Sequence, residues 1–251
     1  MILLQTIDLR KQFGETRACD GLNFVVNKGE FLSLVGSNGA GKTSLVNLIS
    51  AHLTPDSGQI LFEGKDITFT SVHERIKAGI ARSFQIVNLF DGLTVLDNVA
   101  LSIFSREGKT ARIAALADHD RAVRHETLDV LDRFGLESKR DVPAGGLAQG
   151  ERKLLDVAVA YALRPKLLFL DEPTSGVSTR DKTQIMDTVS SVVREGGVTA
   201  VVIEHDMDVV FRYSDRIVMM HEGRFLADGT PNQIRANKDV ANILLGAALS
   251  I

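Results

Sequence analysis

The sequence is organised around one stretch, Gly36-Ser37-Asn38-Gly39-Ala40-Gly41-Lys42-Thr43. It fits the pattern G-x-x-x-x-G-K-[ST], which joins a strand to a helix and wraps around phosphate groups. The flanks agree, because residues 31–35 have the apolar character of a short buried strand and those from Ser44 onward that of a helix. Small residues let the backbone curl so that its N–H groups point at phosphate oxygens. We therefore predict a nucleotide-binding loop, to which the helix N-terminus adds partial positive charge.

Two side chains of this loop have predicted roles. Lys42 is expected to neutralise the β- and γ-phosphates of a nucleotide, and the Thr43 hydroxyl to bind Mg²⁺. The helix that begins at Lys42 is expected to end at Leu53, because residues 54–58 have the composition of a helix stop followed by a turn. The nucleotide contacts expected from this region are Gly36, Ser37, Asn38, Gly39, Ala40, Gly41, Lys42, Thr43 and Ser44.

A second element of such a site lies at 167–172, where an apolar strand ends in Asp171 and Glu172. A carboxylate at the C-terminal edge of a strand suits a water-mediated contact to Mg²⁺, so Asp171 is the expected metal carboxylate. Glu172 points elsewhere and is expected to polarise the attacking water as general base. Taken alone, the stretch could also be an acidic pair that caps a helix.

Length and composition narrow the class of protein. The 251 residues, 44% of them hydrophobic, can bury a full core in one or two domains. The 29 basic and 32 acidic residues nearly balance, which argues against a nucleic-acid binder with a broad basic face. The single Cys19 cannot form an internal disulfide, which favours a reducing cytoplasm. No apolar run approaches the ~20 residues of a membrane helix, so any membrane role is expected to be peripheral.

The order of predicted elements indicates an α/β fold. The first part reads as antiparallel strand pieces at 3–9, 22–26 and 31–35 and a short hairpin formed by 59–62 and Ile67, and a further strand is expected at 80–84. A helical part follows, since apolar residues recur at helical spacing over 96–103 and again over 122–134. Beyond Gly146, apolar strands alternate with helices, which predicts a parallel sheet covered on both faces. The elements expected there are helices 150–163 and 179–194, strands 167–170, 198–203, 216–220 and 224–227, and a helix starting at Thr230.

In this order, the chain resembles the ATP-binding subunit of an ABC transporter over nearly its whole length. The resemblance implies a P-loop NTPase (RecA-like) core with a mixed sheet, an N-terminal antiparallel β subdomain and an inserted α-helical subdomain. It also implies an ATPase with ATP and Mg²⁺ as cofactors. We expect one ABC ATPase domain over 1–251, with the β subdomain and first part of the core at 1–92, the helical subdomain at 93–148, and the remaining core and tail at 149–251.

The resemblance assigns three further residues to the site. Phe13 stands where the family has an aromatic residue that stacks on adenine, although it could simply be a core aromatic. Gln85 stands where the family has a glutamine that touches Mg²⁺ and senses the transmembrane partner. His205 matches the switch histidine that contacts the γ-phosphate. With Lys42 and Glu172, the residues Gln85 and His205 are the expected catalytic set.

The stretch Leu147-Ala148-Gln149-Gly150-Glu151 corresponds to the family signature, usually Leu-Ser-Gly-Gly-Gln, which caps the ATP of a partner subunit. Ala148 replaces the usual serine, while Gly150 and the helix N-terminus keep backbone donors for phosphate. Ala148, Gln149 and Gly150 are therefore expected to contact the ATP held by the partner subunit's loop. We expect ATP hydrolysis to be slower in that pocket than in the pocket formed by this chain's own phosphate-binding loop. The next loop usually ends in Asp but here ends in Ser178.

Within the family, the chain is most similar to the uptake ATPases for branched-chain amino acids and related amides. The similarity lies in 82–90, in 93–99, in the polar insertion before Asp118 and in the tail 243–246. It implies a peripheral subunit at the cytoplasmic face of the inner membrane. The implied partners are a second ABC ATPase subunit (a heterodimer, or a homodimer in isolation), two transmembrane permease subunits and, indirectly, a periplasmic or extracellular solute-binding protein, with no nucleic acid. The surface over 85–99, with Asn88, Leu89, Phe90 and Leu93, is expected to dock a short permease helix, unless Phe90 and Leu93 pack into the helical subdomain.

Other functions remain as alternatives. One is a soluble ABC-type ATPase that is not linked to transport, and another is an importer subunit for a different solute such as urea or amides. The sequence contains no Asn-Lys-x-Asp guanine motif, which disfavours a GTPase. Because the ATPase subunit does not touch the transported solute, no residue in this sequence identifies it.

Overall fold

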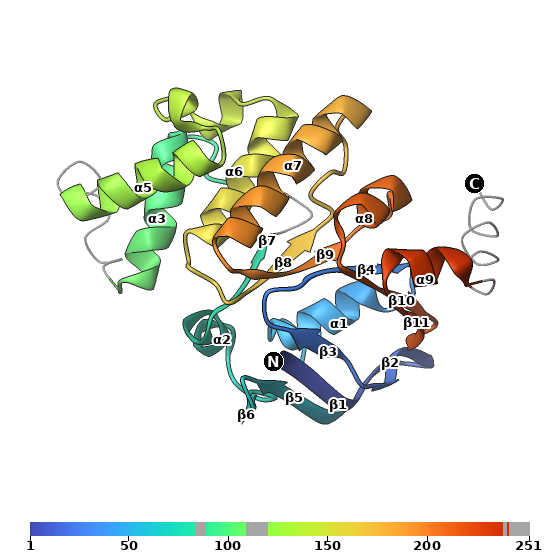
Figure 1. Cartoon of the computed structure of the whole chain (residues 1–251). Helices are drawn as coiled ribbons and strands as arrows, with labels where there is room; N and C mark the ends of the chain where they lie inside the picture. The colour runs from blue at the N-terminus through green and yellow to red at the C-terminus, as the bar shows by residue number, and fades with distance from the viewer. Residues whose placement is uncertain (84–88, 109–119, 238–239, 241–251) are drawn as a thin grey trace. The chain divides into compact units, whose positions relative to one another are not determined.

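The computed structural model describes residues 1–83, 89–108, 120–237 and 240 (Figure 1). The chain divides into two compact units, one formed by residues 1–75 together with those from 199 onward, the other by residues 76–198. Each unit has its own strands and helices. None of the described helices has both the length and the apolar composition needed to cross a membrane.

The first unit begins with an antiparallel sheet in the order β2-β1-β5-β6, with β3 also paired to β1. Its strands are β1 (Ile2–Phe13), β2 (Thr16–Leu22), β3 (Val25–Asn27), β5 (Ser57–Phe62) and β6 (Lys65–Asp66). The prediction of one strand over 22–26 was wrong. The ladder is interrupted there because the buried Thr6 hydroxyl donates to the Leu22 carbonyl and accepts from the Phe24 N–H.

The same unit contains a mixed sheet in which β4 lies between β9 and β10 and is parallel to both, while β11 is antiparallel to β10. Its strands are β4 (Phe31–Gly36), β9 (Thr199–Ile203), β10 (Arg216–His221) and β11 (Arg224–Gly229). All five residues of β9 and the first five of β4 are buried, as expected for continuous apolar strands. The mixed sheet implied by the family resemblance is confirmed. The expectation that the strand at 31–35 belongs to the antiparallel pieces was wrong, because β4 pairs in parallel with β9 and β10.

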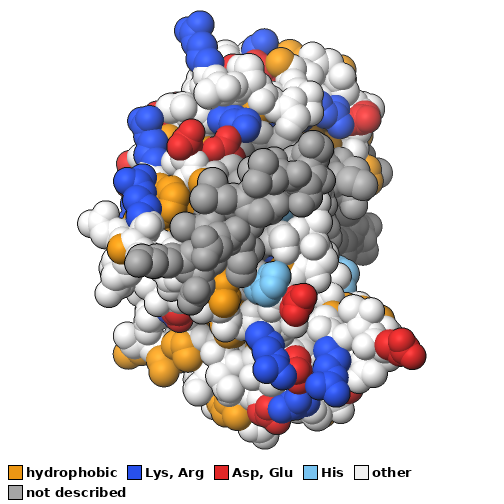
Figure 2. Space-filling view, turned by 90° about the vertical axis from the view of Figure 1, so that its right-hand side faces the viewer, with side chains coloured by type: hydrophobic (Ala, Val, Ile, Leu, Met, Phe, Trp, Pro, Cys, Tyr) orange, Lys and Arg blue, Asp and Glu red, His pale blue; other side chains and the backbone are white. Residues whose placement is uncertain are grey.

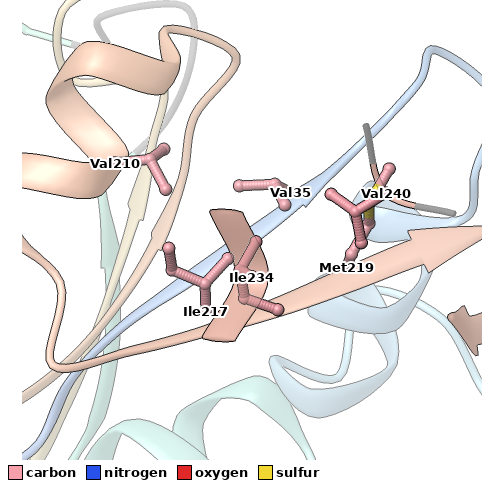
Figure 3. Packing of buried hydrophobic residues seen from close by; sticks show 6 residues of the cluster. All are labelled: Val35, Val210, Ile217, Met219, Ile234 and Val240. Atoms are coloured by element: carbon pink, nitrogen blue, oxygen red, sulfur yellow. The ribbon is translucent and has the colours of Figure 1, made fainter. Parts of the chain in front are cut away.

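Two short helices cover one side of this sheet (Figure 3). They are α8 (Met207–Tyr213) and α9 (Pro231–Ala236). A cluster of buried apolar side chains lies between these helices and the sheet. Alternate residues of a strand face the same side, so β10 contributes two side chains to the cluster and β4 contributes one. The predicted start of α9 is confirmed, because the Thr230 side chain accepts from Gln233 N and the Gln233 side chain accepts from Thr230 N. The cluster consists of Val35, Val210, Ile217, Met219, Ile234 and Val240.

Helix α1 (Lys42–Ile49) ends earlier than the predicted Leu53, because Ala51 adopts a left-handed φ of 64° and the His52 N–H donates to the Asn47 carbonyl (2.8 Å). Arg75, on α2 (Val72–Ala78), is 2% exposed and donates to the carbonyls of Leu48 and Ile49. The same guanidinium donates to the carbonyls of Ile67 (2.7 Å) and Thr68 (2.9 Å). Burial lowers the pKa of Arg75 to about 10. One buried cation therefore joins α1, α2 and the β5–β6 hairpin.

We expect Arg75→Met to destabilise the protein by about 3–5 kcal/mol, because it leaves four buried carbonyls without a charged donor. The urea midpoint of the full chain measures the effect. Arg121→Met removes the same charge from an exposed position and should stay within about 0.5 kcal/mol of the parent. Equal midpoints for the two variants would contradict a structural role for Arg75.

The second unit pairs strand β7 (Ile80–Ser83) in parallel with β8 (Leu167–Asp171). Its helices are α3 (Val95–Arg106), α5 (Arg121–Arg133), α6 (Gln149–Tyr161) and α7 (Thr179–Glu195), with short 3₁₀ turns η2 (Glu137–Lys139) and η3 (Ala144–Gly146). The apolar face predicted over 96–103 is confirmed, since it is buried where α3 packs on α5 and α6. Arg106 joins α3 to α5 by donating to both Glu126 oxygens (2.6 and 2.8 Å), which lowers the pKa of Glu126.

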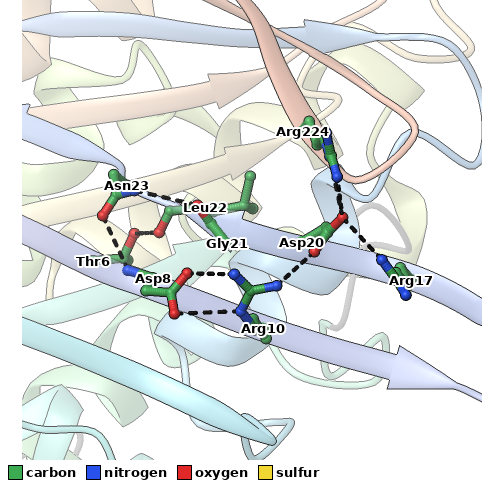
Figure 4. Close-up of polar contacts among 9 residues, drawn as sticks. All are labelled: Thr6, Asp8, Arg10, Arg17, Asp20, Gly21, Leu22, Asn23 and Arg224. Atoms are coloured by element: carbon green, nitrogen blue, oxygen red, sulfur yellow. Dashed lines mark hydrogen bonds and ion pairs between the residues drawn. The ribbon is translucent and has the colours of Figure 1, made fainter.

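Asp20 lies at the centre of a cluster of charged side chains in the first unit. Asp20 accepts from Arg10 (2.8 Å) and Arg224 (2.7 Å) and lies 3.6 Å from Arg17, so that three arginines surround one carboxylate (Figure 4). The hydrogen bond from Arg224 is the main reason why the pKa of Asp20 is lowered. On the face drawn in Figure 2, basic and acidic side chains are similarly interspersed.

Candidate nucleotide-binding site

The predicted loop lies between β4 and α1 and needs glycine at two positions. A Cβ on Gly36 (φ 150°) would collide with the Met220 carbonyl oxygen, and one on Gly41 (φ 103°) with that of Ala18. The Ala40 carbonyl accepts from Gly223 N (3.0 Å), which ties the loop to the β10–β11 turn. Neighbouring strands thus hold the backbone in the curled form that presents N–H groups to an anion.

Lys42 is 6% exposed and bridges the two ends of this loop. Its Nζ donates to the carbonyls of Gly36 (2.7 Å) and Ser37 (3.0 Å). The first turn of α1, which is fully described, contains no acidic side chain that would cancel the partial charge of the helix N-terminus. Thr43 and Asn38 are exposed at the mouth of the loop. The Lys42 ammonium and the N-terminus of α1 therefore both lie at the loop where phosphates are expected to bind.

His205 follows β9, the parallel neighbour of β4, so the strand end that precedes it lies at the same edge of the sheet as the loop. The buried Glu204 side chain accepts from the backbone N–H groups of His205 (3.0 Å) and Asp206 (3.4 Å). Asp206 in turn caps α8. These contacts fix the backbone of the turn and leave the His205 side chain exposed.

Phe13, at the end of β1, is 47% exposed, so the alternative of a core aromatic is wrong. The Lys11 ammonium lies 5.6 Å from the centroid of its ring and pairs with Asp56 at 2.7 Å. One side of the ring is thereby occupied by a cation, an arrangement that stabilises the aromatic side chain. Stacking of this ring on adenine stays a prediction.

In the second unit, β8 is buried throughout and ends at Asp171, whose Oδ2 accepts from Arg82 Nη2 at 2.6 Å. Glu172 adopts a positive φ of 49°, a strained conformation for a residue other than glycine and one often found at functional sites. Lys153 Nζ donates to the Glu172 carbonyl (3.2 Å) and to Ser175 Oγ (3.0 Å). No helix begins at this pair, since turns follow it until α7, so the helix-capping alternative is wrong.

The signature-like stretch leads into α6, whose N-cap is the exposed Ala148. Ala148 lacks a hydroxyl, so only the return half of a capping box forms, from Ala148 N to Glu151 Oε2 at 3.0 Å. A Cβ on Gly176 (φ 76°) would approach Gln149 Nε2 to 2.5 Å, which places the following loop against the signature. Ser178, where the family usually has Asp, still caps α7 by accepting from Asp181 N (3.3 Å).

The predicted site residues thus fall into two groups. The first unit brings together the loop and the edge that leads to His205, with Phe13 at the end of β1, and the second contains Asp171, Glu172 and the signature. Gln85, Asn88, the tail 243–246 and residues 109–119 of the insertion lie outside the described residues. The oxygen donors predicted for Mg²⁺ on Thr43 and Asp171 are the kind that this ion prefers. Sequence reasoning missed Arg82, although a charged residue in an apolar strand is a usable signal.

A glycine-rich loop between strand and helix, with a buried lysine at its base, defines a P-loop nucleotide-binding protein. A sequence model of the ABC transporter family matches residues 19–175, and the chain belongs to this family. It is an ATP-binding ATPase subunit of an ABC transporter.

Individual relatives cover nearly the whole chain. It is 33% identical to the high-affinity branched-chain amino acid transport ATP-binding protein BraF of Pseudomonas aeruginosa, over 98% of both chains. It is 34% identical to the methionine import ATP-binding protein MetN of Rhizobium etli, over 97% of this chain and 66% of that protein. The ADP conformation of the ABC transporter cassette MJ1267 superimposes with a TM-score of 0.88 at 30% identity, over 98% and 99% of the two chains. The dimeric bacterial cassette MJ0796 gives 0.77 at 25% identity, over 91% and 99%.

Proposed function

We propose that the chain is the ATP-hydrolysing subunit of an ABC importer for branched-chain amino acids or a similar small solute. The observation that carries this proposal is the end-to-end similarity to BraF, together with the loop geometry around Lys42. The methionine importer among the relatives supports uptake of amino acids more generally. The test is uptake of labelled leucine, methionine and urea by cells with and without the gene. Loss of urea uptake alone would overturn the choice of solute.

In this function, Lys42 and the N–H groups of residues 36–44 bind the phosphates. Thr43, Gln85 and Asp171 would hold Mg²⁺, which supplies neutralisation of charge on the β- and γ-phosphates. Glu172 accepts a proton from the attacking water, and His205 contacts the γ-phosphate. Phe13 stacks on adenine, with Lys11 on one side of its ring.

The active assembly in this proposal is a face-to-face pair of ATPase subunits beneath two permease subunits at the cytoplasmic face of the membrane. The solved dimer of MJ0796 supports pairing of this kind. Each ATP would lie between the loop of one subunit and the signature of the other. The exposure of Ala148 and Gln149 at the start of α6 is consistent with such a contact. A solute-binding protein outside the membrane would deliver the cargo.

Permease docking is proposed around Phe90 and Leu93, which are 62% and 38% exposed. The alternative, that both pack into the helical subdomain, does not fit these exposed fractions. The backbone at Phe90 is fixed, because its N–H donates to Asn98 Oδ1 (2.9 Å) and its carbonyl accepts from Asn98 Nδ2 (3.2 Å). A rigid turn therefore presents an apolar side chain to the outside, as expected of an interface anchor.

We expect Phe90→Asp to release the subunit from membranes that contain its permease partners, because it places a charge in an apolar contact. The urea midpoint should stay within about 0.5 kcal/mol of the parent, since the side chain is exposed. Membrane-bound and soluble fractions are measured by sedimentation. Phe90→Leu, which keeps an apolar group, should remain membrane-bound. Recovery of Phe90→Asp with the membranes at the parental level would count against docking at this turn.

A further inference from the structure

A buried ion pair connects two adjacent strands of the second unit at the predicted metal carboxylate. Arg82 on β7 lies opposite Phe169 on β8, and Asp171 follows two residues later. Residues two apart on a strand face the same side, so Arg82 and Asp171 share one face of the strand pair. The guanidinium Nη2 lies 2.6 Å from Asp171 Oδ2, and the two side chains are 8% and 6% exposed.

The pair uses only one oxygen of the carboxylate. Among the described residues, Oδ2 accepts from Arg82, whereas Oδ1 makes no hydrogen bond. A carboxylate with one fixed and one available oxygen has a defined orientation at the strand end. A buried ion pair of this kind adds little net stability compared with an apolar contact, so its value lies in specifying geometry.

We propose that Arg82 is a positioning residue for ATP hydrolysis, one that orients Asp171 so that Oδ1 is available to the hydrated Mg²⁺. This inference rests on the proposed function, which assigns Asp171 to the metal. Arginine suits the role because its guanidinium keeps its charge when buried and donates a charge-assisted hydrogen bond to the carboxylate. A purely structural pair would affect folding but not metal affinity, and this difference can be measured.

The experiment compares Arg82→Met with Asp171→Asn and with a control, Arg106→Met. The control breaks the Arg106–Glu126 ion pair (2.6 Å), in the same unit but on helices α3 and α5. The full chain is loaded with a non-hydrolysable ATP analogue, and its affinity for Mn²⁺ is read from the loss of the free-ion electron paramagnetic resonance signal. Binding of the analogue without metal is measured in EDTA.

We expect Arg82→Met and Asp171→Asn each to weaken Mn²⁺ binding about 10- to 100-fold, the usual effect of losing a group that orients a metal ligand. Analogue binding in EDTA should change by no more than about twofold, and Arg106→Met should keep the parental Mn²⁺ affinity. If Arg82→Met does not fold, Arg82→Gln retains an N–H donor and should show a smaller loss.

Parental Mn²⁺ affinity in a folded Arg82 variant, with weakened affinity in Asp171→Asn, would overturn the role of Arg82 and leave the proposed site intact. Parental affinity in Asp171→Asn would instead overturn the assignment of the metal carboxylate. In the double variant, Arg82→Met should add no further loss to Asp171→Asn, because both act through one carboxylate. An additional loss of similar size would show that Arg82 acts independently and would contradict the proposal.

Discussion

Glu172→Gln is expected to lower ATP turnover by about 10²–10⁴-fold while ATP still binds, because it removes the general base and keeps the shape of the side chain. The amide cannot accept the proton of the attacking water. Glu172 follows the buried strand β8, and its carbonyl is held by Lys153, so the new side chain should occupy the same place. Phosphate release at steady state measures turnover, and a fluorescent ATP analogue measures affinity.

Blocked hydrolysis should also leave a visible product. If ATP closes two subunits face to face, Glu172→Gln with its partner should accumulate as an ATP-bound dimer, detected by size-exclusion chromatography. Glu137→Gln makes the same chemical change at an exposed position on η2 and should behave as the parent. Parental turnover in Glu172→Gln would show that another group is the base.

The sequence predicted correctly those helices and strands whose ends are determined by residues within or next to the element. Helix α7 was expected over 179–194 and spans Thr179–Glu195, because Ser178 caps it and its apolar residues recur at helical spacing. The strands β4, β8 and β9 were likewise found, since continuous apolar runs between turns leave few alternatives. The phosphate-binding loop was the most secure of all, because its function requires fixed residue types at fixed positions.

Elements that depend on distant contacts were predicted less well. The carbonyl of Ile49, at the end of α1, is capped by Arg75, which lies 26 residues further along the sequence and has no local signal there. The break between β2 and β3 depends on the Thr6 hydroxyl, 18 residues before Phe24. The short helices α2 and α8 were missed, since seven-residue helices have little periodicity to detect. A long-range hydrogen bond explains the break between β2 and β3, whereas short length explains the two missed helices.

The candidate site shows the same division. The acidic strand end at Asp171 was identified from its residues, but the guanidinium that contacts it comes from a strand more than eighty positions earlier in the sequence. Likewise, the collision of a Cβ on Gly41 with the Ala18 carbonyl explains a required glycine only once β2 is in place. Motifs therefore identified the groups expected to contact ATP, whereas the groups that position them required the fold.

Lys42→Ala is expected to abolish nucleotide binding at ordinary concentrations. Each charge-assisted contact to phosphate contributes about 1.5–3 kcal/mol, so two lost contacts weaken binding by roughly 10²–10⁴-fold. The structure adds a second reason, because Lys42 Nζ also joins the Gly36 and Ser37 carbonyls and so keeps the loop curled. Affinity for a fluorescent ATP analogue, with and without Mg²⁺, measures the loss.

Two comparisons separate this effect from general damage to the protein. Lys65→Ala removes a lysine from the exposed strand β6 and should bind the analogue as the parent does. Unlike Glu172→Gln, which should bind ATP without hydrolysing it, Lys42→Ala should fail at the binding step itself. The two variants therefore separate binding of ATP from its hydrolysis. Unchanged affinity in a folded Lys42→Ala variant would remove the basis for placing the phosphates in this loop.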